Sequence, residues 1–380
     1  MKVSGPWLDH PETQALCLSL ERGGYRAFFV GGCVRNALMG LPVGDIDIAT
    51  DAHPETVSRI AESCGFRVVP TGIDHGTVTV IAGGLAHEVT TFRRDVKTDG
   101  RHATVAFSHH VEEDAGRRDF TMNALYADRT GTVIDPLGGL PDLVARKVRF
   151  VGDANARIVE DFLRILRFFR FYAHYGDPNT GMDAEGLAAC AENSAGLDKL
   201  SRERIGAEMR KLFAAPDPAP AVASMNSAGV LPQILPGADP RGLAPLVHLE
   251  SDLPPRWLRR LAVLGGDDAA ARLRLSRQEA SDLRALQGQI GGLLSPAALG
   301  FTLGEALGTD AVLARAAVME SPLPADWARD VARGAAAIFP IRASDLMDRF
   351  QGPALGAALK AAQQRWLASN LTLTRDQLLA

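Results

Sequence analysis

The chain has 380 residues, of which 46% are hydrophobic, and a formal net charge of −4. This length exceeds the size at which one hydrophobic core keeps growing, so we expect two or three structural units. No apolar run approaches the roughly 20 residues that a membrane-spanning helix needs. The charge excludes a protein that binds nucleic acid over its whole surface, but it is compatible with a local basic surface.

The N-terminal segment and the cysteines indicate where the protein works. Residues 1–11 contain a single lysine, no apolar segment and no small-residue cleavage site, so we expect no signal peptide. Cys17, Cys33, Cys64 and Cys190 are widely separated, with neither metal-ligand spacing nor disulfide density. We interpret them as small buried side chains in a reducing compartment, and we expect a cytoplasmic protein.

The first 140 residues alternate helical and strand-like segments, which is typical of a mixed α/β domain. We expect helices over 11–21, 34–39 and 54–64, and strands over 27–30, 45–49, 66–69, 76–81, 88–92 and 132–134. Beyond residue 140 the strand patterns stop. Helical periodicity covers 157–172, 201–213 and most of the remainder. The sequence therefore predicts an α+β domain followed by an all-α region.

Two short motifs near the N-terminus predict a site for a metal-bound nucleoside triphosphate. The expected strand ending at Val30 runs into Gly31, Gly32 and Arg35, and the glycines would let the backbone approach a phosphate. On the next expected strand, Asp45 and Asp47 emerge on one face because successive side chains alternate. Two carboxylates so placed can share magnesium ions, although a lone D-x-D is more often a solvated edge or a turn.

A third carboxylate follows on another expected strand. Glu88 precedes a run of Val and Thr and could complete a two-metal centre beside the D-x-D pair. The alternative interpretation is a surface strand residue paired with Arg93 or Arg94.

Arginines in two further segments fit a nucleotide. Arg118, in the run Arg117-Arg118-Asp119-Phe120, suits a polyphosphate because a guanidinium donates in pairs and keeps its charge. Asp119 could equally cap a following helix. Along 160–170, Asp161 and Arg164 lie three residues apart on one expected helix and could read a base edge together, with Arg167 and Arg170 further round. The alternative is an ordinary salt bridge on a helix surface.

Six motifs, in this order, resemble those of class II tRNA nucleotidyltransferases and bacterial poly(A) polymerases. They are Gly31-Gly32-x-Val34-Arg35, Asp45-Ile46-Asp47, Glu88-Val89-Thr90-Thr91-Phe92-Arg93, Arg117-Arg118-Asp119-Phe120-Thr121-Met122-Asn123-Ala124, Asp135-Pro136-x-Gly138-Gly139 and Glu160-Asp161-x-x-Arg164-x-x-Arg167. The resemblance covers roughly residues 25–215.

The resemblance implies a head like that of the DNA polymerase β superfamily over 1–140, a helical neck over 141–215, and a helical body and tail over 216–380 that hold RNA. By the same resemblance, Asp45 and Asp47 bind Mg²⁺ and Glu88 assists. Gly32, Arg35 and Arg118 contact the triphosphate. Asp161 and Arg164 form a protein template for the base of CTP or ATP, and Arg167 and Arg170 match further nucleotide contacts. A loop from Asp95 to Ala103 matches the family's mobile element.

The implied activity is addition of CCA to the 3′ end of tRNA, with CTP and ATP as substrates and neither a membrane nor an obligate protein partner. The alternatives are a poly(A) polymerase, an enzyme that adds only part of CCA, a silent RNA-binding module and a small-molecule nucleotidyltransferase. One departure from the family pattern is Asn36, which stands where an aspartate usually follows the arginine.

Overall fold

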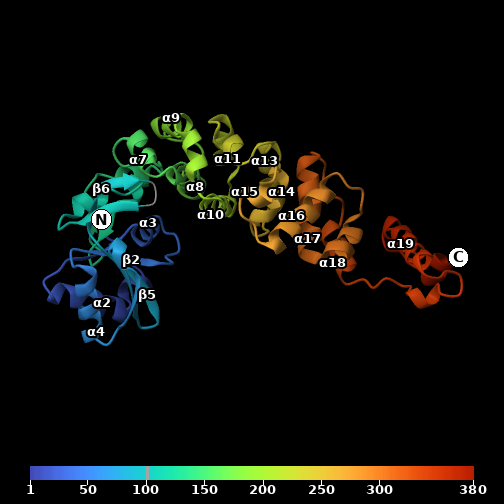
Figure 1. Ribbon diagram of the computed structural model, residues 1–380, viewed down its shortest axis with the longest axis horizontal. Coiled ribbons are helices and arrows are strands. Elements are labelled where there is room, and N and C mark those ends of the chain that lie inside the picture. The colour runs from blue at the N-terminus through green and yellow to red at the C-terminus, as the bar shows by residue number, and fades with distance from the viewer. Residues whose placement is uncertain (100–101) are drawn as a thin grey trace. The chain divides into compact units, whose positions relative to one another are not determined.

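The computed structural model describes the backbone of residues 1–99 and 102–380, and the side chains in these ranges except those of Asp74 and of 95–105. The chain forms two compact units, Met1–Leu200 (unit 1) and Ser201–Ala380 (unit 2). Figure 1 labels their elements.

Unit 1 is built on a seven-stranded sheet with the order β3-β4-β5-β2-β1-β8-β9. Its strands are β1 (Ala27–Val30), β2 (Ile46–Thr50), β3 (Arg67–Gly72), β4 (Thr77–Ala82), β5 (Leu85–Thr91), β8 (Tyr126–Ala127) and β9 (Val133–Ile134). Strands β2 and β5 are parallel, and every other neighbouring pair is antiparallel. The predicted α+β domain is confirmed, and the expected strands match those of this sheet apart from shifts at their ends and β8, which the sequence analysis missed.

Helices α2 (Pro11–Arg22) and α4 (Pro54–Ser63) contact each other and the strands of this sheet. Ile46 pairs with His87 of β5, and Nε2 of His87 lies 2.8 Å from Oγ1 of Thr13 in α2. The side chains of Ile46 and Ile48 therefore lie on the face of the sheet that these helices cover. Both isoleucines are buried. Alternation along the strands therefore leaves the opposite face for Asp47.

The opposite face is partly covered by α5 (Val111–Gly116). Val30 of β1, Ala49 of β2 and Tyr126 of β8 form a buried cluster there with residues of α5 and with neighbouring side chains. This cluster fixes the strand ends that carry the polar side chains described below. Helix α3 (Gly32–Leu38) begins after β1 and the single residue Gly31, and it contacts both β1 and β2.

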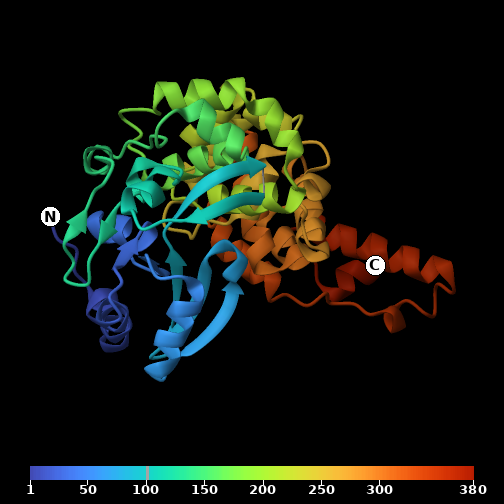
Figure 2. The same ribbon diagram turned by 60° about the vertical axis from the view of Figure 1, so that its left-hand side comes forward.

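A hairpin of two strands, β6 (Arg93–Asp99) and β7 (His102–Phe107), follows the sheet and is visible as a pair of cyan arrows in Figure 2. The segment expected to be a loop over 95–103 therefore consists mostly of strand. The sequence did not signal these strands, because backbone hydrogen bonds can pair two strands without an alternation of apolar residues. Residues 100–101 of that loop lie outside the described residues. Its mobility stays a prediction.

The remaining helices of unit 1 are α1 (Pro6–Asp9), α6 (Leu140–Val144), α7 (Ala154–Glu160), α8 (Leu163–Tyr175) and α9 (Ala184–Glu192), with 3-10 turns at Ile73–His75, Thr121–Asn123 and Ser194–Lys199. The expected single helix over 157–172 is wrong. The backbone of Asp161 is extended, with φ −153° and ψ 105°. Its Oδ1 accepts a hydrogen bond from the backbone N of Leu163 at 3.1 Å, so Asp161 ends α7 and its side chain caps the first residue of α8.

Unit 2 is helical in all its named elements. They are α10 (Arg202–Phe213), α11 (Ala219–Ser227), α12 (Val230–Ile234), α13 (Leu243–Glu250), α14 (Trp257–Leu264), α15 (Ala269–Arg272), α16 (Arg277–Ile290), α17 (Pro296–Val318), α18 (Trp327–Ala335), α19 (Pro353–Ala368) and α20 (Arg375–Leu379), with 3-10 turns at Pro240–Gly242 and Ala343–Asp345. The predicted all-α region is confirmed.

Among the described helices, α17 alone has the length and composition of a membrane span. In its most apolar window 56% is buried inside the protein, and Gly304 interrupts the helix with φ 78°. Asp310, in the same helix, is fully buried against Arg259. These features are those of a core helix.

Three of the cysteines, Cys17, Cys33 and Cys190, are buried free thiols as expected, and burial raises the pKa of each. The expectation is wrong for Cys64, which is exposed. It follows the last residue of α4, where the helix ends and its side chain has no core to enter.

Candidate active site

Three carboxylates lie on neighbouring segments of the sheet. Asp47 is in β2, Asp45 directly precedes that strand, and the parallel register pairs Asp47 with Glu88 of β5. Paired residues of adjacent strands point to the same face, so the expected proximity of Glu88 to the D-x-D pair holds. Asp45 and Glu88 are exposed, and Asp47 is partly buried.

Arg118, the cation whose charge acts on Asp47, is itself paired with Asp114, so the three carboxylates retain an excess of negative charge. Burial, together with the neighbouring charges of Glu88 and Asp45, raises the pKa of Asp47 to about 6 against the opposing charge of Arg118. A divalent cation would relieve this repulsion, and carboxylate oxygens are its natural ligands. The donor set thus fits Mg²⁺.

The protein alone would not enclose such an ion. In the part of the chain that the structure describes, no group of three or more His, Cys, Asp or Glu side chains is close enough to hold a metal. Mg²⁺ commonly takes one or two carboxylates and completes its shell with water and substrate phosphates. Asp45 and Asp47 suit that role.

The glycine turn lies beside Arg118. Gly31 has φ 70° and ψ −117°, a conformation that only glycine adopts readily, and α3 begins at the next residue, Gly32. A Cβ at Gly31 would lie 3.5 Å from Nη1 of Arg118. The turn therefore keeps one edge of this guanidinium uncovered next to the backbone expected to meet a phosphate.

Arg35, whose contact with the triphosphate stays a prediction, is held by three polar side chains. Its guanidinium donates to the side-chain oxygens of Asn123 and Asn36 and to the hydroxyl of Tyr175, and it stacks 4.0 Å from the centroid of that tyrosine ring. The side chain is buried, and burial lowers its pKa. In this arrangement Arg35 joins α3 to the end of α8.

Asp119 and Arg167 form a second link to α8. The carboxylate of Asp119 is buried and accepts from Nε of Arg167 at 2.7 Å and from Nδ2 of Asn123 at 2.9 Å. Burial by itself would raise the pKa of Asp119, but Arg167 and these hydrogen bonds lower it below its usual range. Asp119 therefore orients Arg167 rather than capping a regular helix. Arg170 lies over Phe171, with 4.6 Å from its guanidinium to the ring centroid.

The two predicted base-reading residues are not paired with each other. Asp161 accepts from the backbone N of Leu163, the first residue of α8, while Arg164 donates to Glu160 and, at 2.7 Å, to the backbone oxygen of Arg157. The alternative interpretation, a salt bridge between Asp161 and Arg164, is wrong, because the helix breaks between Glu160 and Leu163. Both side chains remain at the start of α8.

Sequence reasoning missed several residues that hold the site together. Asp114 and Tyr126 bind Arg118, and Tyr175 binds Arg35. Asp114 is four residues before Arg118, a helical spacing that could have signalled the ion pair. Nothing local in the sequence signals Tyr126 or Tyr175.

Two family models match the chain. The poly A polymerase head domain matches residues 27–149. The probable RNA and SrmB-binding site of polymerase A matches residues 181–241.

Similar proteins include CCA-adding enzymes. The CCA-adding enzyme of Geobacillus thermodenitrificans (strain NG80-2) is 41% identical over 266 residues, which is 69% of this chain and 61% of that protein. The mitochondrial CCA tRNA nucleotidyltransferase 1 of Homo sapiens is 46% identical over 217 residues, 56% of this chain and 50% of that protein. The chain thus matches these curated relatives over half to three-fifths of their own length.

Among solved structures, the Bacillus stearothermophilus CCA-adding enzyme in complex with CTP superposes with a TM-score of 0.74 and 30% identity. The match covers 96% of this chain and 94% of that one. Together with the ordered motifs and the mixed sheet, it shows that the chain belongs to the family of class II CCA-adding enzymes and bacterial poly(A) polymerases.

Proposed function

We propose that this protein adds CCA to the 3′ end of tRNA from CTP and ATP, without a nucleic-acid template, and releases pyrophosphate. The observation that carries the proposal is the parallel register of β2 and β5. It sets Glu88 beside Asp47 on the sheet, with Asp45 directly before β2. The relatives named as CCA-adding enzymes support the choice of this reaction within the family.

In this proposal Asp45 and Asp47 hold Mg²⁺, and Glu88 assists them. When bound, Mg²⁺ activates the attacking 3′ hydroxyl and neutralises charge on the triphosphate. Gly32 and Arg118 receive the triphosphate, so that the hydroxyl reaches the α-phosphate in line with the leaving pyrophosphate. Arg35 in α3 would contact the triphosphate as well, and Asn36, Asn123 and Tyr175 orient its guanidinium.

The base of the incoming nucleotide would meet the start of α8. We propose that Asp161 and Arg164 present acceptor and donor groups to its edge. Arg164 is already oriented by Glu160 and by the backbone of Arg157, so its guanidinium needs little ordering on binding. Arg167 and Arg170 complete the nucleotide site from the same helix.

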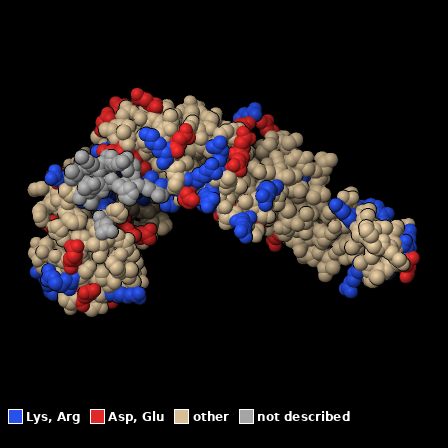
Figure 3. Space-filling view, viewed as in Figure 1, with Lys and Arg blue, Asp and Glu red and all other residues tan. Residues whose placement is uncertain are grey.

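The RNA partner requires positive charge away from the carboxylates. Arg202 and Lys211 on α10 and Arg277 and Arg284 on α16 are exposed. Figure 3 shows Lys and Arg gathered over the segment that Figure 1 labels α10 and α16, mixed with Asp and Glu. We propose a head over 1–140, a neck over 141–215 and an RNA-holding body and tail over 216–380, acting in the cytoplasm.

The test supplies the purified full chain with Mg²⁺, labelled CTP or ATP, and tRNA transcripts ending at the discriminator base, at C and at CC. We expect addition of C, C and one A, followed by arrest. Chelation with EDTA should stop incorporation, and added Mg²⁺ should restore it. Asp45→Ala is the inactive control, expected to retain tRNA binding.

A long ladder of A would instead make the protein a poly(A) polymerase. Incorporation of only one nucleotide type would make it a partial CCA-adding enzyme. Binding of tRNA with no incorporation would leave a silent RNA-binding module.

A further inference from the structure

Arg118 is held by two buried groups, Asp114 and Tyr126. Its Nη2 donates to Oδ2 of Asp114 at 2.8 Å, and its Nε donates to the hydroxyl of Tyr126 at 3.0 Å. The same Oδ2 accepts from the Tyr126 hydroxyl at 2.7 Å, which closes a three-membered ring of hydrogen bonds. Asp114 and Tyr126 are 1% and 0% exposed to solvent, whereas the side chain of Arg118 is 19% exposed.

The two groups come from elements whose positions the sheet and its core fix. Tyr126 is in β8 and pairs with Val30, the residue directly before Gly31. Asp114 is in α5, whose Val111 and Ala115 pack into the same cluster as Tyr126. Neither group has freedom to follow Arg118 if it moves, so both act as fixed anchors for its guanidinium.

The ring of hydrogen bonds leaves one end of Arg118 for a ligand. Nε and Nη2 are engaged, while Nη1 faces Gly31, where a Cβ would lie 3.5 Å away. A guanidinium donates in its plane, so fixing two of its nitrogens also fixes the direction of the third. Gly31 directly follows β1, which pairs with β2, the strand that carries Asp47, so this end of Arg118 lies beside the strands that carry the proposed metal site.

We propose that Asp114 and Tyr126 are positioning residues that hold the Nη1 end of Arg118 toward the triphosphate of the incoming nucleotide. This inference rests on the proposed function for its substrate. It predicts that the two residues serve CTP and ATP equally, because both nucleotides share the triphosphate and differ only in the base.

The experiment measures affinity for inorganic tripolyphosphate by calorimetry in the presence of Mg²⁺, and KM and kcat for CTP and ATP. Asp114→Asn and Tyr126→Phe are compared with Asp142→Asn. Asp142 is also a buried carboxylate of unit 1, but it accepts from Thr121 and makes no contact with Arg118. Thermal unfolding of each variant controls for loss of fold.

We expect tripolyphosphate binding to weaken about 10-fold or more in Asp114→Asn and a few-fold in Tyr126→Phe. KM should rise in parallel for CTP and ATP, with a smaller change in kcat and an unchanged choice between the two nucleotides. In an Arg118→Ala background, Tyr126→Phe should add almost nothing, because it acts through that arginine. Asp142→Asn should leave tripolyphosphate affinity at the wild-type value.

Wild-type affinity in a folded Tyr126→Phe variant would overturn the inference, as would an effect of the same size in the Arg118→Ala background. Tyr126→Phe removes a single oxygen, so it decides the matter if Asp114→Asn fails to fold. A wild-type protein that binds tripolyphosphate but adds no nucleotide would refute the proposed function. The roles of Asp114 and Tyr126 would then be decided by the tripolyphosphate affinities of the variants alone.

Discussion

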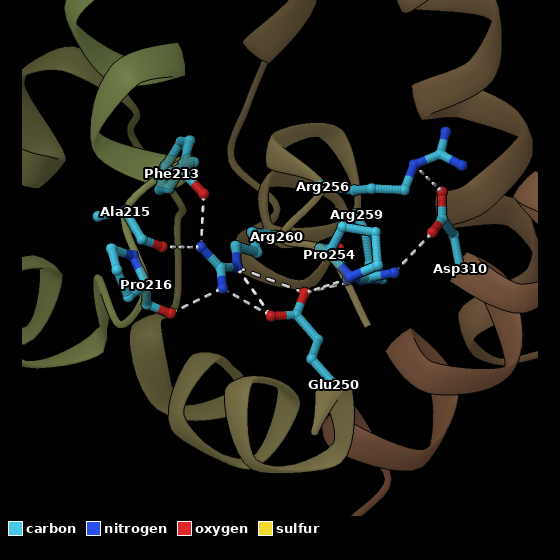
Figure 4. A network of polar contacts seen from close by, with 9 residues as sticks. All are labelled: Phe213, Ala215, Pro216, Glu250, Pro254, Arg256, Arg259, Arg260 and Asp310. Carbon is cyan, nitrogen blue, oxygen red and sulfur yellow. Dashed lines mark hydrogen bonds and ion pairs between the residues drawn. The ribbon is translucent and has the colours of Figure 1, made fainter. Parts of the chain in front are cut away.

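Both units of the chain bring acidic and basic side chains together, and the balance of charge differs between them. In unit 1, Asp45 and Glu88 lie near Asp47, and Arg118, the cation that acts on Asp47, is already paired with Asp114. In unit 2, a buried network shown in Figure 4 joins two carboxylates to three arginines. The acidic excess in unit 1 marks a place for a cationic ligand, whereas the network in unit 2 is complete without one.

The network in unit 2 leaves little polar surface without a partner. Glu250 bridges Arg259 and Arg260, and Asp310 binds Arg259 at 3.0 Å and Arg256 at 3.2 Å. Arg260 also donates to the backbone oxygens of Phe213, Ala215 and Pro216. These bonds tie α14 to the end of α10, to α13 and to α17, so the network acts as scaffold.

The largest expected effect separates the two clusters. Asp47→Asn removes a proposed metal ligand and one charge of a repelling group. We expect nucleotide incorporation to fall about 10³-fold or more, since a bound metal contributes several kcal/mol to the transition state. We expect no loss of thermal stability, because the variant relieves like-charge repulsion. Single-turnover assays and thermal melts measure both; retained activity with a lowered melting temperature would reverse the comparison.

Glu250→Gln is the converse change. It leaves Arg259 and Arg260 buried with one carboxylate fewer, and removal of one partner from such a pair costs about 3–5 kcal/mol. We expect the free energy of unfolding of unit 2, from urea titration, to fall by about that amount, while KM for CTP stays near its wild-type value in the folded protein.

A matched control for Glu250→Gln is Glu203→Gln, whose exposed pair with Arg274 has side chains 62% and 69% accessible. Exposed pairs contribute about 0–1 kcal/mol, so its effect should be small. Equal destabilisation by the two substitutions would show that the buried network is not scaffold.

The fold and the carboxylates could be predicted because their signals are local. Alternation around Ile46 and Ile48 placed Asp45 and Asp47 on one face, and the strand containing Glu88 had the same kind of pattern. The break at Asp161 was missed because the apolar spacing of Ile158, Ile165 and Phe169 continues across it. All three are buried even though two helices carry them.

Contacts between distant segments could not be predicted. Whether Arg35 meets a phosphate or Tyr175 depends on how α8 packs against α3, which no pattern near Arg35 encodes. The same holds for Tyr126, whose role follows from its pairing with Val30 in the sheet. Sequence spacing identified residues with the right chemistry but not their partners.

Substitution of Asp161, next to the start of α8, should have a smaller effect, and this effect should fall on the choice of nucleotide. Asp161→Asn keeps a side-chain oxygen for the backbone N of Leu163 but removes the carboxylate that would read the base. We expect stability to be nearly unchanged and the preference between CTP and ATP to shift about 10-fold, in line with about 1–3 kcal/mol for a good base contact. Asp161→Ala should shift the preference and also cost about 1 kcal/mol of stability through the lost cap.

Competition assays on transcripts ending at C and at CC report that preference. An unchanged preference in both variants would mean that Asp161 only caps the start of α8 and does not read the base.

Acid should affect the two units in opposite directions, and this is the smallest effect. Arg167 and hydrogen bonds hold the pKa of Asp119 below its usual value against the effect of burial. Its stabilisation of unit 1 is therefore complete above the unfolded pKa of about 3.9 and is lost as pH falls through the lower folded value. Burial raises the pKa of Asp310, against the opposing charges of Arg256 and Arg259. Its contribution to unit 2 is present below the unfolded pKa and is lost as pH rises through the folded value.

Urea unfolding from pH 3 to pH 7, followed separately for each unit by hydrogen exchange, measures both slopes. Asp119→Asn should flatten the acid loss of unit 1 below about pH 4, since the group that binds protons on unfolding is gone. Unit 2 should lose unfolding free energy as pH rises above about 4, because Asp310 ionises more readily in the unfolded chain. Asp310→Asn should abolish this loss. If the unfolding free energy of both units changed with pH in the same direction, Asp310 would be held ionised by its arginines. The network would then stabilise this carboxylate as Arg167 stabilises that of Asp119.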